Sequence, residues 1–231
     1  MKKKSILFSI ALMYTLAISL TSYAQSNKLN IGIEGGPSII SLRHENVKQK
    51  NFHSPSIGYS VGIALQYNFK KRFSIHSAIL FERKGAKTKK QGTDSLGKNI
   101  YMFNTFDNFD YLTLPLLVRA NFGKKINLFI NAGPYISYLI QQHSLIKFPE
   151  EAPFNNQQYT YTNSFYKMDY GISGGVGLAI PIKQKLVFSI EARNNLGLNN
   201  IQKLWYSTKT NSANLLLGVA YKFGERKEKS I

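Results

Sequence analysis

Acid–base side chains are the most reactive groups in this 231-residue sequence, which contains four histidines and no cysteine. Without cysteine, a disulfide scaffold, a thiolate metal site and a cysteine nucleophile are all excluded. A histidine can activate a neighbouring serine hydroxyl for nucleophilic attack. None of the four histidines has serine two residues later, which is the spacing expected of a lipid deacylase. The histidines are His44, His53, His76 and His143.

Seven titratable or charged side chains share one face of the expected strands. The period-two alternation described below predicts that this face is the interior one. Two carboxylates brought together on such a face could act as a general acid and a general base. The alternative is a structural network, because charges that are removed from water must be paired. The seven residues are Glu34, His76, Glu82, Arg119, Asp169, Glu191 and Arg193.

Lysine and arginine outnumber aspartate and glutamate by 30 to 12, which gives a formal net charge of +18. A strongly basic chain suggests nucleic acid or an anionic membrane surface as its partner. Basic residues are dense around positions 83–98, and aromatic residues accompany them in the expected outer loops. Each basic residue near an anionic lipid surface contributes about 1 kcal/mol. We expect a lipid-phosphate or partner surface here, formed by Lys84, Lys87, Lys89, Lys90 and Trp205.

Residues 1–24 have the three parts of a secretory signal peptide. Three lysines follow Met1, residues 6–20 are uncharged and mostly apolar, and Ser22 and Ala24 supply the small residues before a cleavage site. The apolar run is shorter than the roughly 18 residues that a membrane-spanning helix needs. We therefore expect cleavage after Ala24 and export, which argues against nucleic acid as the partner.

The rest of the chain alternates between apolar and small or polar residues with a period of two, the signature of β-strands. In residues 57–67 one face carries Ile, Tyr, Val and Leu, and the other carries Gly, Ser, Ala and Gln. A face of such small residues suggests a crowded interior beside a continuous apolar exterior. The expected strands are residues 29–41, 57–67, 73–84, 111–122, 128–139, 168–180, 186–196 and 213–223.

The connections between these eight segments are alternately long and short. The short ones are residues 69–72, 123–126 and 181–184. Short turns at one end, long loops at the other and an even number of strands are typical of a transmembrane β-barrel. Strands of about 9–11 residues suffice to cross the bilayer, and a closed barrel satisfies every backbone group within lipid. A soluble barrel of the lipocalin type, with its apolar residues inside, is the alternative.

We therefore predict an all-β fold, an eight-stranded antiparallel up-and-down transmembrane β-barrel formed by residues 25–224. A charged tail, residues 225–231, follows it, and both termini are expected in the periplasm. The interior of an eight-stranded barrel is just filled by side chains. We accordingly interpret the seven interior residues as a structural salt-bridge network that plugs the lumen. On this interpretation none of them is catalytic, and we expect neither a cofactor nor a metal.

Four sequence motifs resemble the PorT-type outer-membrane β-barrel family. They are YLTLPLL at residues 111–117, NAGPY at 131–135, DYGISGGVG at 169–177 and EAR at 191–193. The resemblance covers essentially all of residues 27–224. It implies an outer-membrane barrel, and one branch of the family takes part in protein secretion across the outer membrane. Many outer-membrane barrels end on an aromatic residue, whereas Phe223 is followed here by the charged tail.

These observations lead us to expect a non-enzymatic integral outer-membrane protein with a plugged lumen that presents its outer loops for interaction. Its expected partners are outer-membrane lipid, lipopolysaccharide and a protein partner, with an accessory role in secretion. Two alternatives stay open at this point. One is a lipid-modifying enzyme, an acyl hydrolase or transferase that uses a loop histidine. The other is a small passive porin.

Overall fold

Nine β-strands and one short 3-10 helix make up the computed structural model, which describes residues 29–44, 54–93, 99–123, 126–150, 152, 154–182, 185–203 and 207–223. Among these residues no helix is long and apolar enough to span a membrane. The elements are β1 (Leu29–His44), β2 (Ser56–Asn68), β3 (Phe73–Thr93), β4 (Asn99–Phe122), β5 (Asn127–Lys147), β6 (Gln157–Thr160), η2 (Thr162–Ser164), β7 (Met168–Pro181), β8 (Leu186–Gly197) and β9 (Thr208–Phe223).

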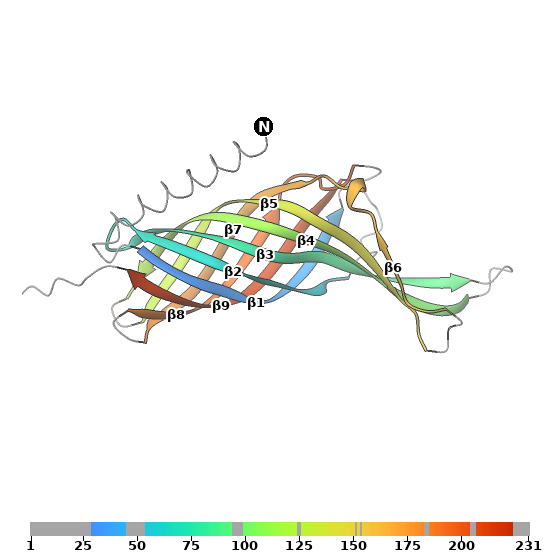
Figure 1. Cartoon of the computed structure of the whole chain (residues 1–231), viewed down its shortest axis with the longest axis horizontal. Helices are drawn as coiled ribbons and strands as arrows, with labels where there is room; N and C mark the ends of the chain where they lie inside the picture. Colours follow the sequence, from blue (N-terminus) through green and yellow to red (C-terminus); the bar gives the residue numbers. More distant parts are fainter. Residues whose placement is uncertain are drawn as a thin grey trace, which may run out of the picture.

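Eight of the strands form a closed ring in which each strand is antiparallel to both neighbours (Figure 1). The order around the ring is the order along the chain, β1 to β5 and then β7 to β9, and the β1–β9 and β4–β5 pairings complete it. The ninth strand, β6, lies outside the ring and pairs with β5 over residues 143–146. The predicted eight-stranded up-and-down antiparallel barrel is therefore confirmed.

The outer surface of the ring is apolar and its inner surface is polar. Along β2, β3 and β4, Ile63, Ile79 and Leu116 point outward and are each more than half exposed. Neighbouring inward positions carry buried polar or small side chains such as Ser60 and Thr113. Because a lipocalin-type barrel would hold its apolar residues inside, the soluble alternative is wrong. An apolar exterior around a polar interior is the arrangement of a transmembrane barrel.

The two ends of the barrel differ, as the alternating connections predict. Three short connections lie at one end, called here the turn end, where Leu29 at the start of β1 pairs with Phe223 at the end of β9. The opposite end, called here the loop end, carries the longer connections and β6 (Figure 1). Because the ring is closed, each of its eight strands has a hydrogen-bonded neighbour on both sides, which satisfies the backbone groups within lipid.

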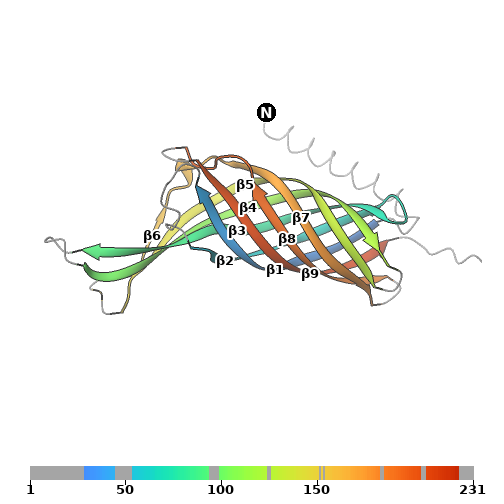
Figure 2. The same cartoon turned by 180° about the vertical axis from the view of Figure 1, so that it is seen from behind.

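Strands β3, β4 and β5 are longer than the sequence predicts. Residues 85–110 and 140–167 were expected to be loops, but β3 runs to Thr93, β4 starts at Asn99 and β5 reaches Lys147. The apolar alternation fades there because these parts do not face lipid. They continue past the ring as a sheet at the loop end (Figures 1 and 2). We call this sheet the extension. It is formed by the part of β3 after Gly85, the part of β4 before Asn108, the part of β5 after Gln141, and β6.

Gly85 lies where β3 leaves the barrel and enters the extension. Its φ of 153° is positive, a backbone conformation that a side chain disfavours. A Cβ atom at this position would also lie 1.9 Å from the carbonyl oxygen of Asp107 on the neighbouring strand β4. Glycine therefore permits the close approach of β3 and β4 at the point where the sheet departs from the ring.

Candidate functional site in the barrel interior

Arg193 on β8 is the centre of a buried cluster in the half of the lumen nearer the turn end, called here the turn-side cluster. It donates hydrogen bonds from Nη1 to Glu34 Oε1 at 2.9 Å and from Nε and Nη2 to the two oxygens of Glu191, the latter at 2.9 Å. Arg119 Nη2 donates to Glu191 Oε2 at 2.9 Å. His76 Nε2 lies 3.1 Å from Glu34 Oε2. All five side chains are buried.

The turn-side cluster joins strands that are not neighbours in the ring. Glu34 lies on β1, His76 on β3, Arg119 on β4, and both Glu191 and Arg193 on β8. Successive inward positions of a strand are two residues apart, which places Glu191 and Arg193 side by side. The Arg119–Glu191 pair joins β4 to β8 across the lumen, whereas the contacts of Glu34 with Arg193 and His76 each join strands separated by a single strand. Each buried charge is thereby left with a partner.

Uncharged residues complete the turn-side cluster. Gln66 Oε1 accepts a hydrogen bond from Arg119 Nη1 at 3.0 Å, and Asn131 Nδ2 donates to Glu191 Oε1 at 3.1 Å. The guanidinium carbon of Arg119 lies 3.8 Å from the centre of the Phe129 ring, a cation–π contact. Phe129 pairs across the sheet with Gly177, where a Cβ atom would lie 2.4 Å from the ring. Glycine at 177 thus makes room for the aromatic ring that supports Arg119.

A second buried cluster, called here the loop-side cluster, surrounds Lys84 on β3. Its Nζ lies 3.0 Å from Asp169 Oδ2 and 3.7 Å from Glu82 Oε2. The ammonium group also lies 4.5 Å from the centre of the Tyr135 ring. Tyr135 of β5 pairs across the sheet with Gly171 of β7. As with Phe129 and Gly177, a glycine thus lies beside the aromatic ring that supports the cation. Neutral donors to the two carboxylates are Thr113, Asn195, Thr210 and Ser212.

The seven interior residues named from the sequence thus lie in two clusters. Glu34, His76, Arg119, Glu191 and Arg193 share the turn-side cluster, whereas Glu82 and Asp169 share the loop-side cluster. The cation that pairs Glu82 with Asp169 was missed. The sequence spacing could have identified this cation. Lys84 follows Glu82 by two residues, so the two side chains face the same side of β3 as long as the strand continues past Lys84.

The assignment of Lys84 to a surface is wrong. The residue is 1 % exposed and lies inside the lumen, because β3 does not end at position 84 but continues to Thr93. Lys89 and Lys90 are exposed on the extension. Lys87 is partly exposed, and its Nζ lies 5.3 Å from the centre of the Phe106 ring. Trp205, the remaining residue of the expected surface, lies outside the described residues.

Apolar side chains fill the lumen beyond the loop-side cluster. Phe109 and Tyr111 of β4 pack with Leu139 of β5 and with Ile201 from the connection between β8 and β9, and all four are buried. Phe165 adds an edge-to-face contact with Phe109, with ring centres 4.8 Å apart. This layer and the two clusters occupy successive levels of the barrel, so the interior is packed from the loop end to the turn-side cluster.

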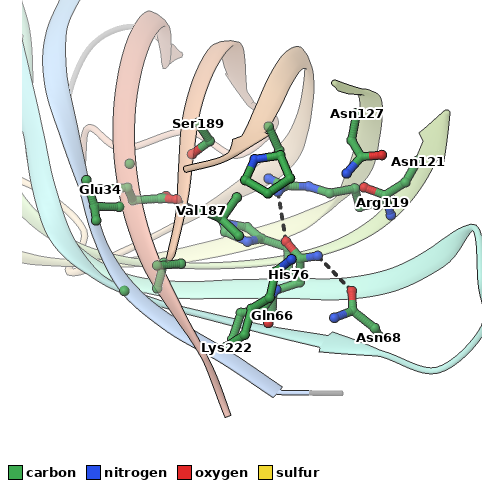
Figure 3. Close-up of a pocket in the computed structure, with 18 of the residues that line it drawn as sticks. Glu34, Gln66, Asn68, His76, Arg119, Asn121, Asn127, Val187, Ser189 and Lys222 are labelled. Carbon is green, nitrogen blue, oxygen red and sulfur yellow. Dashed lines mark hydrogen bonds and ion pairs between the residues drawn. The ribbon is translucent and has the colours of Figure 1, made fainter. Parts of the chain in front are cut away.

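The turn end of the lumen, by contrast, holds a cavity of about 440 Å³ (Figure 3). Its floor includes Glu34, His76 and Arg119 of the turn-side cluster, and its mouth includes Lys70, Lys71 and Lys222. Its walls carry amide side chains. The barrel therefore has the form of a cup that is closed at the loop end and open at the turn end.

The arrangement offers ion pairing and hydrogen bonding rather than an evident catalytic centre. Within the described residues, no group of three or more His, Asp and Glu side chains could hold a metal ion. His143 on β5 lies near Asp110, with Nδ1 4.0 Å from the carboxylate. The adjacent hydroxyl, Ser144 Oγ, donates its hydrogen bond to Asp107 instead. The His44 side chain and His53 lie outside the described residues.

Comparisons with known proteins give one match to a family model and a set of similar solved structures. The family model described as outer membrane protein β-barrel domain matches residues 23–203. A comparison with curated protein sequences gives no match. Similar solved structures include neisserial surface protein A (TM-score 0.46, 12 % identity, 84 % of this chain and 97 % of that chain covered). Others are a major outer membrane protein of Thermus thermophilus (0.44, 12 %, 84 % and 99 %) and outer membrane protein W of E. coli (0.41, 13 %, 86 % and 99 %).

Proposed function

The chain belongs to the outer membrane protein β-barrel domain family, and from this premise we propose that it is a non-enzymatic protein that binds a protein partner through its extension. Its location is the outer membrane. The same proposal has two further parts. A signal peptide that is cleaved after Ala24 directs export, and the turn end of the barrel faces the periplasm. The extension then projects from the outer face of the cell, where a partner or lipopolysaccharide can reach it.

The observation that carries this proposal is the surface of the extension. Met102 of β4 and Tyr159 of β6 are at least 41 % exposed although they lie beyond the apolar belt of the barrel, and so is Tyr161, the residue directly after β6. Exposed apolar side chains gathered on a projecting sheet are characteristic of interaction sites. Aromatic residues contribute most of the binding energy in many protein interfaces. A sheet whose only role was to connect strands would not need them.

The charge of the extension supports the choice of partner. Lys87 and Lys147 lie near the Phe106 ring, 5.3 and 5.5 Å from its centre, and Lys89 and Lys90 are exposed on the same sheet. We propose that these lysines contact lipopolysaccharide phosphates or acidic side chains of the partner. Complementary charge of this kind speeds association and selects the partner. The PorT-type resemblance suggests protein secretion as the process that the partner serves.

A co-purification experiment from outer membranes tests the extension as the binding surface. A tagged variant with Tyr159→Ser and Tyr161→Ser should lose a partner that the unmodified protein retains. The matched control carries Phe69→Ser and Ile182→Ser, two exposed apolar residues at the turn end, and should retain it. If the extension variant retains the same partner at the same yield, the proposal is refuted.

A lipid-modifying enzyme is the second candidate, and the proximity of His143 to Asp110 is the observation that favours it. The 4.0 Å separation is longer than a hydrogen bond, and Arg83 donates to both oxygens of Asp110, so Asp110 would have to turn toward His143 to orient it. An imidazole oriented by a carboxylate is the usual general base for a hydroxyl nucleophile. The test is to substitute His143→Gln and to compare lipid A acylation by mass spectrometry in cells with and without the protein. An acylation pattern that depends on neither the protein nor His143 rejects the enzyme.

A further inference from the structure

The cavity at the turn end of the lumen has a strongly basic lining. Four of its described lining residues are cations, namely Lys70, Lys71, Arg119 and Lys222, whereas Glu34 is the single carboxylate among them. Glu34 is moreover already paired with Arg193, which lies beneath the cavity. Arg119 is likewise paired, with Glu191 of the same cluster. The floor is therefore balanced in charge, and the formal excess of +3, with His76 neutral, is that of the three lysines at the mouth.

Amide side chains line the cavity, and two of them are hydrogen-bonded to each other, with Gln66 Nε2 donating to Asn68 Oδ1 at 2.8 Å. Asn68, Asn121 and Asn127 line it together with Gln66, so amide groups surround a volume of about 440 Å³ (Figure 3). Pockets of roughly 300–1,000 Å³ are the size that small-molecule sites occupy. The cavity opens only a few residues from the ends of the strands, between the β2–β3 turn and Lys222 near the end of β9.

Two buried nitrogens at the floor have no hydrogen-bond partner within the part of the chain that the structure describes. Arg119 uses Nη1 and Nη2 for Gln66 and Glu191, but its Nε has none. His76 uses Nε2 for Glu34, but its Nδ1 has none. Both residues are only 4 % exposed. Buried polar atoms are rarely left without a partner unless they have a role or a missing ligand. The Arg119 Nε–H favours an acceptor oxygen, whereas Nδ1 of a neutral His76 that donates Nε2–H to Glu34 is an acceptor and favours a hydroxyl.

We propose that this cavity binds a small anion carrying carboxylate or phosphate groups, which enters from the turn end past Lys70, Lys71 and Lys222. The lysines attract the anion, Arg119 offers its unpartnered Nε–H at the floor, and amide side chains of the wall donate hydrogen bonds to the remaining oxygens. Charge-assisted hydrogen bonds to carboxylate and phosphate are stronger than neutral ones. The site is independent of the extension, because it lies at the opposite end of the barrel.

Isothermal titration of the full-length protein in a non-ionic detergent tests the site, with citrate and inorganic phosphate as probes and glycerol as the neutral control. Measurements are made at about 10 mM ionic strength, where charges act over roughly 30 Å. Citrate or phosphate should bind, and the preferred probe identifies the carboxylate or the phosphate class. Glycerol should give no signal.

Two pairs of matched variants locate the binding. Substituting Lys70, Lys71 and Lys222 by Gln should weaken binding roughly tenfold or more, since each exposed ion pair contributes a few tenths to about 1 kcal/mol. Substituting Lys87, Lys89 and Lys90 by Gln removes the same charge from the extension and should leave the affinity within about twofold. Both sets lie outside the buried ion-pair clusters, so the substitutions leave those pairs intact.

The second pair blocks the cavity without changing its charge. Ala179 of β7 lines the cavity, whereas the adjacent Ile180 is on the outer face. Ala179→Trp should abolish binding, and Ile180→Trp should leave it unchanged. The proposal is overturned if neither probe binds, or if the two lysine sets weaken binding equally. Undiminished binding in a folded Ala179→Trp variant overturns it as well.

Discussion

Arg193 joins β8 to β1 over the inner face of β9, and its replacement tests whether the turn-side cluster stabilises the barrel as a coupled unit. The guanidinium donates to both oxygens of Glu191 and to one oxygen of Glu34. Arg193→Met would leave two buried carboxylates sharing Arg119 and His76. Removing one partner of a buried ion pair costs about 3–5 kcal/mol. We therefore expect Arg193→Met to lower the free energy of unfolding by about that amount.

A double-mutant cycle separates pairing from simple loss of packing. In the variant with Arg193→Met and Glu191→Gln, Glu34 and Arg119 remain, so the formal charge of the cluster is balanced again. The double variant should be more stable than the sum of the two single effects predicts, by about 1–3 kcal/mol. Ile190→Val, at the lipid-facing neighbour of Glu191, serves as the control and should stay within about 0.5 kcal/mol of the unmodified protein.

The assay is urea unfolding of the protein in phospholipid vesicles, with the folded fraction measured by heat-modifiable migration on gels. Because a membrane barrel migrates differently when folded, the fraction can be read at each urea concentration. Two outcomes refute the reasoning. One is an Arg193→Met effect below about 1 kcal/mol, and the other is additivity of the two substitutions to within about 0.5 kcal/mol.

Three further predictions concern other parts of the barrel. In planar bilayers the protein should show no conductance above background, because side chains fill the lumen; a stable single-channel current would contradict this. Lys84→Met should destabilise the fold by about 3–5 kcal/mol in the same urea assay, because it leaves Glu82 and Asp169 without their cation, whereas Lys90→Met on the extension should have little effect. Ile63→Arg on the lipid-facing surface should cost about 2–4 kcal/mol or prevent insertion into vesicles, and an unchanged unfolding curve would argue against a bilayer at that level.

The ring itself could be predicted from the sequence because strand pleating leaves a direct trace in it. Each residue such as Ile63 that faces lipid is followed by one that faces the lumen, and both environments are uniform along the strand. The order of short and long connections then indicated how the ends differ. Hence Glu34, Asp169 and Arg193 were all assigned to the interior, where the structure places them.

The extension and the division of the interior into two clusters could not be predicted in the same way. Beyond Gly85 neither face of β3 meets lipid, so the alternation that reveals a strand weakens although the pairing with β4 continues. Lys84, the last residue of the expected strand 73–84, was assigned to an outer surface for the same reason. Which carboxylate meets which cation depends on the height of each residue in the barrel, and that height is set by strand stagger. Periodicity along one strand carries no information about it.

The pairs of the turn-side cluster also bear on how the barrel is assembled. Glu34 and Arg193, which meet over the inner face of β9, are separated by 159 positions in the chain, so the first and the penultimate strands of the ring must both be present before they can pair. A half-built sheet without β8 would carry Glu34 into lipid without its arginine, at a cost of several kcal/mol. Charge pairing therefore penalises insertion of an incomplete sheet, and closure of the ring and entry into the bilayer become a single cooperative event.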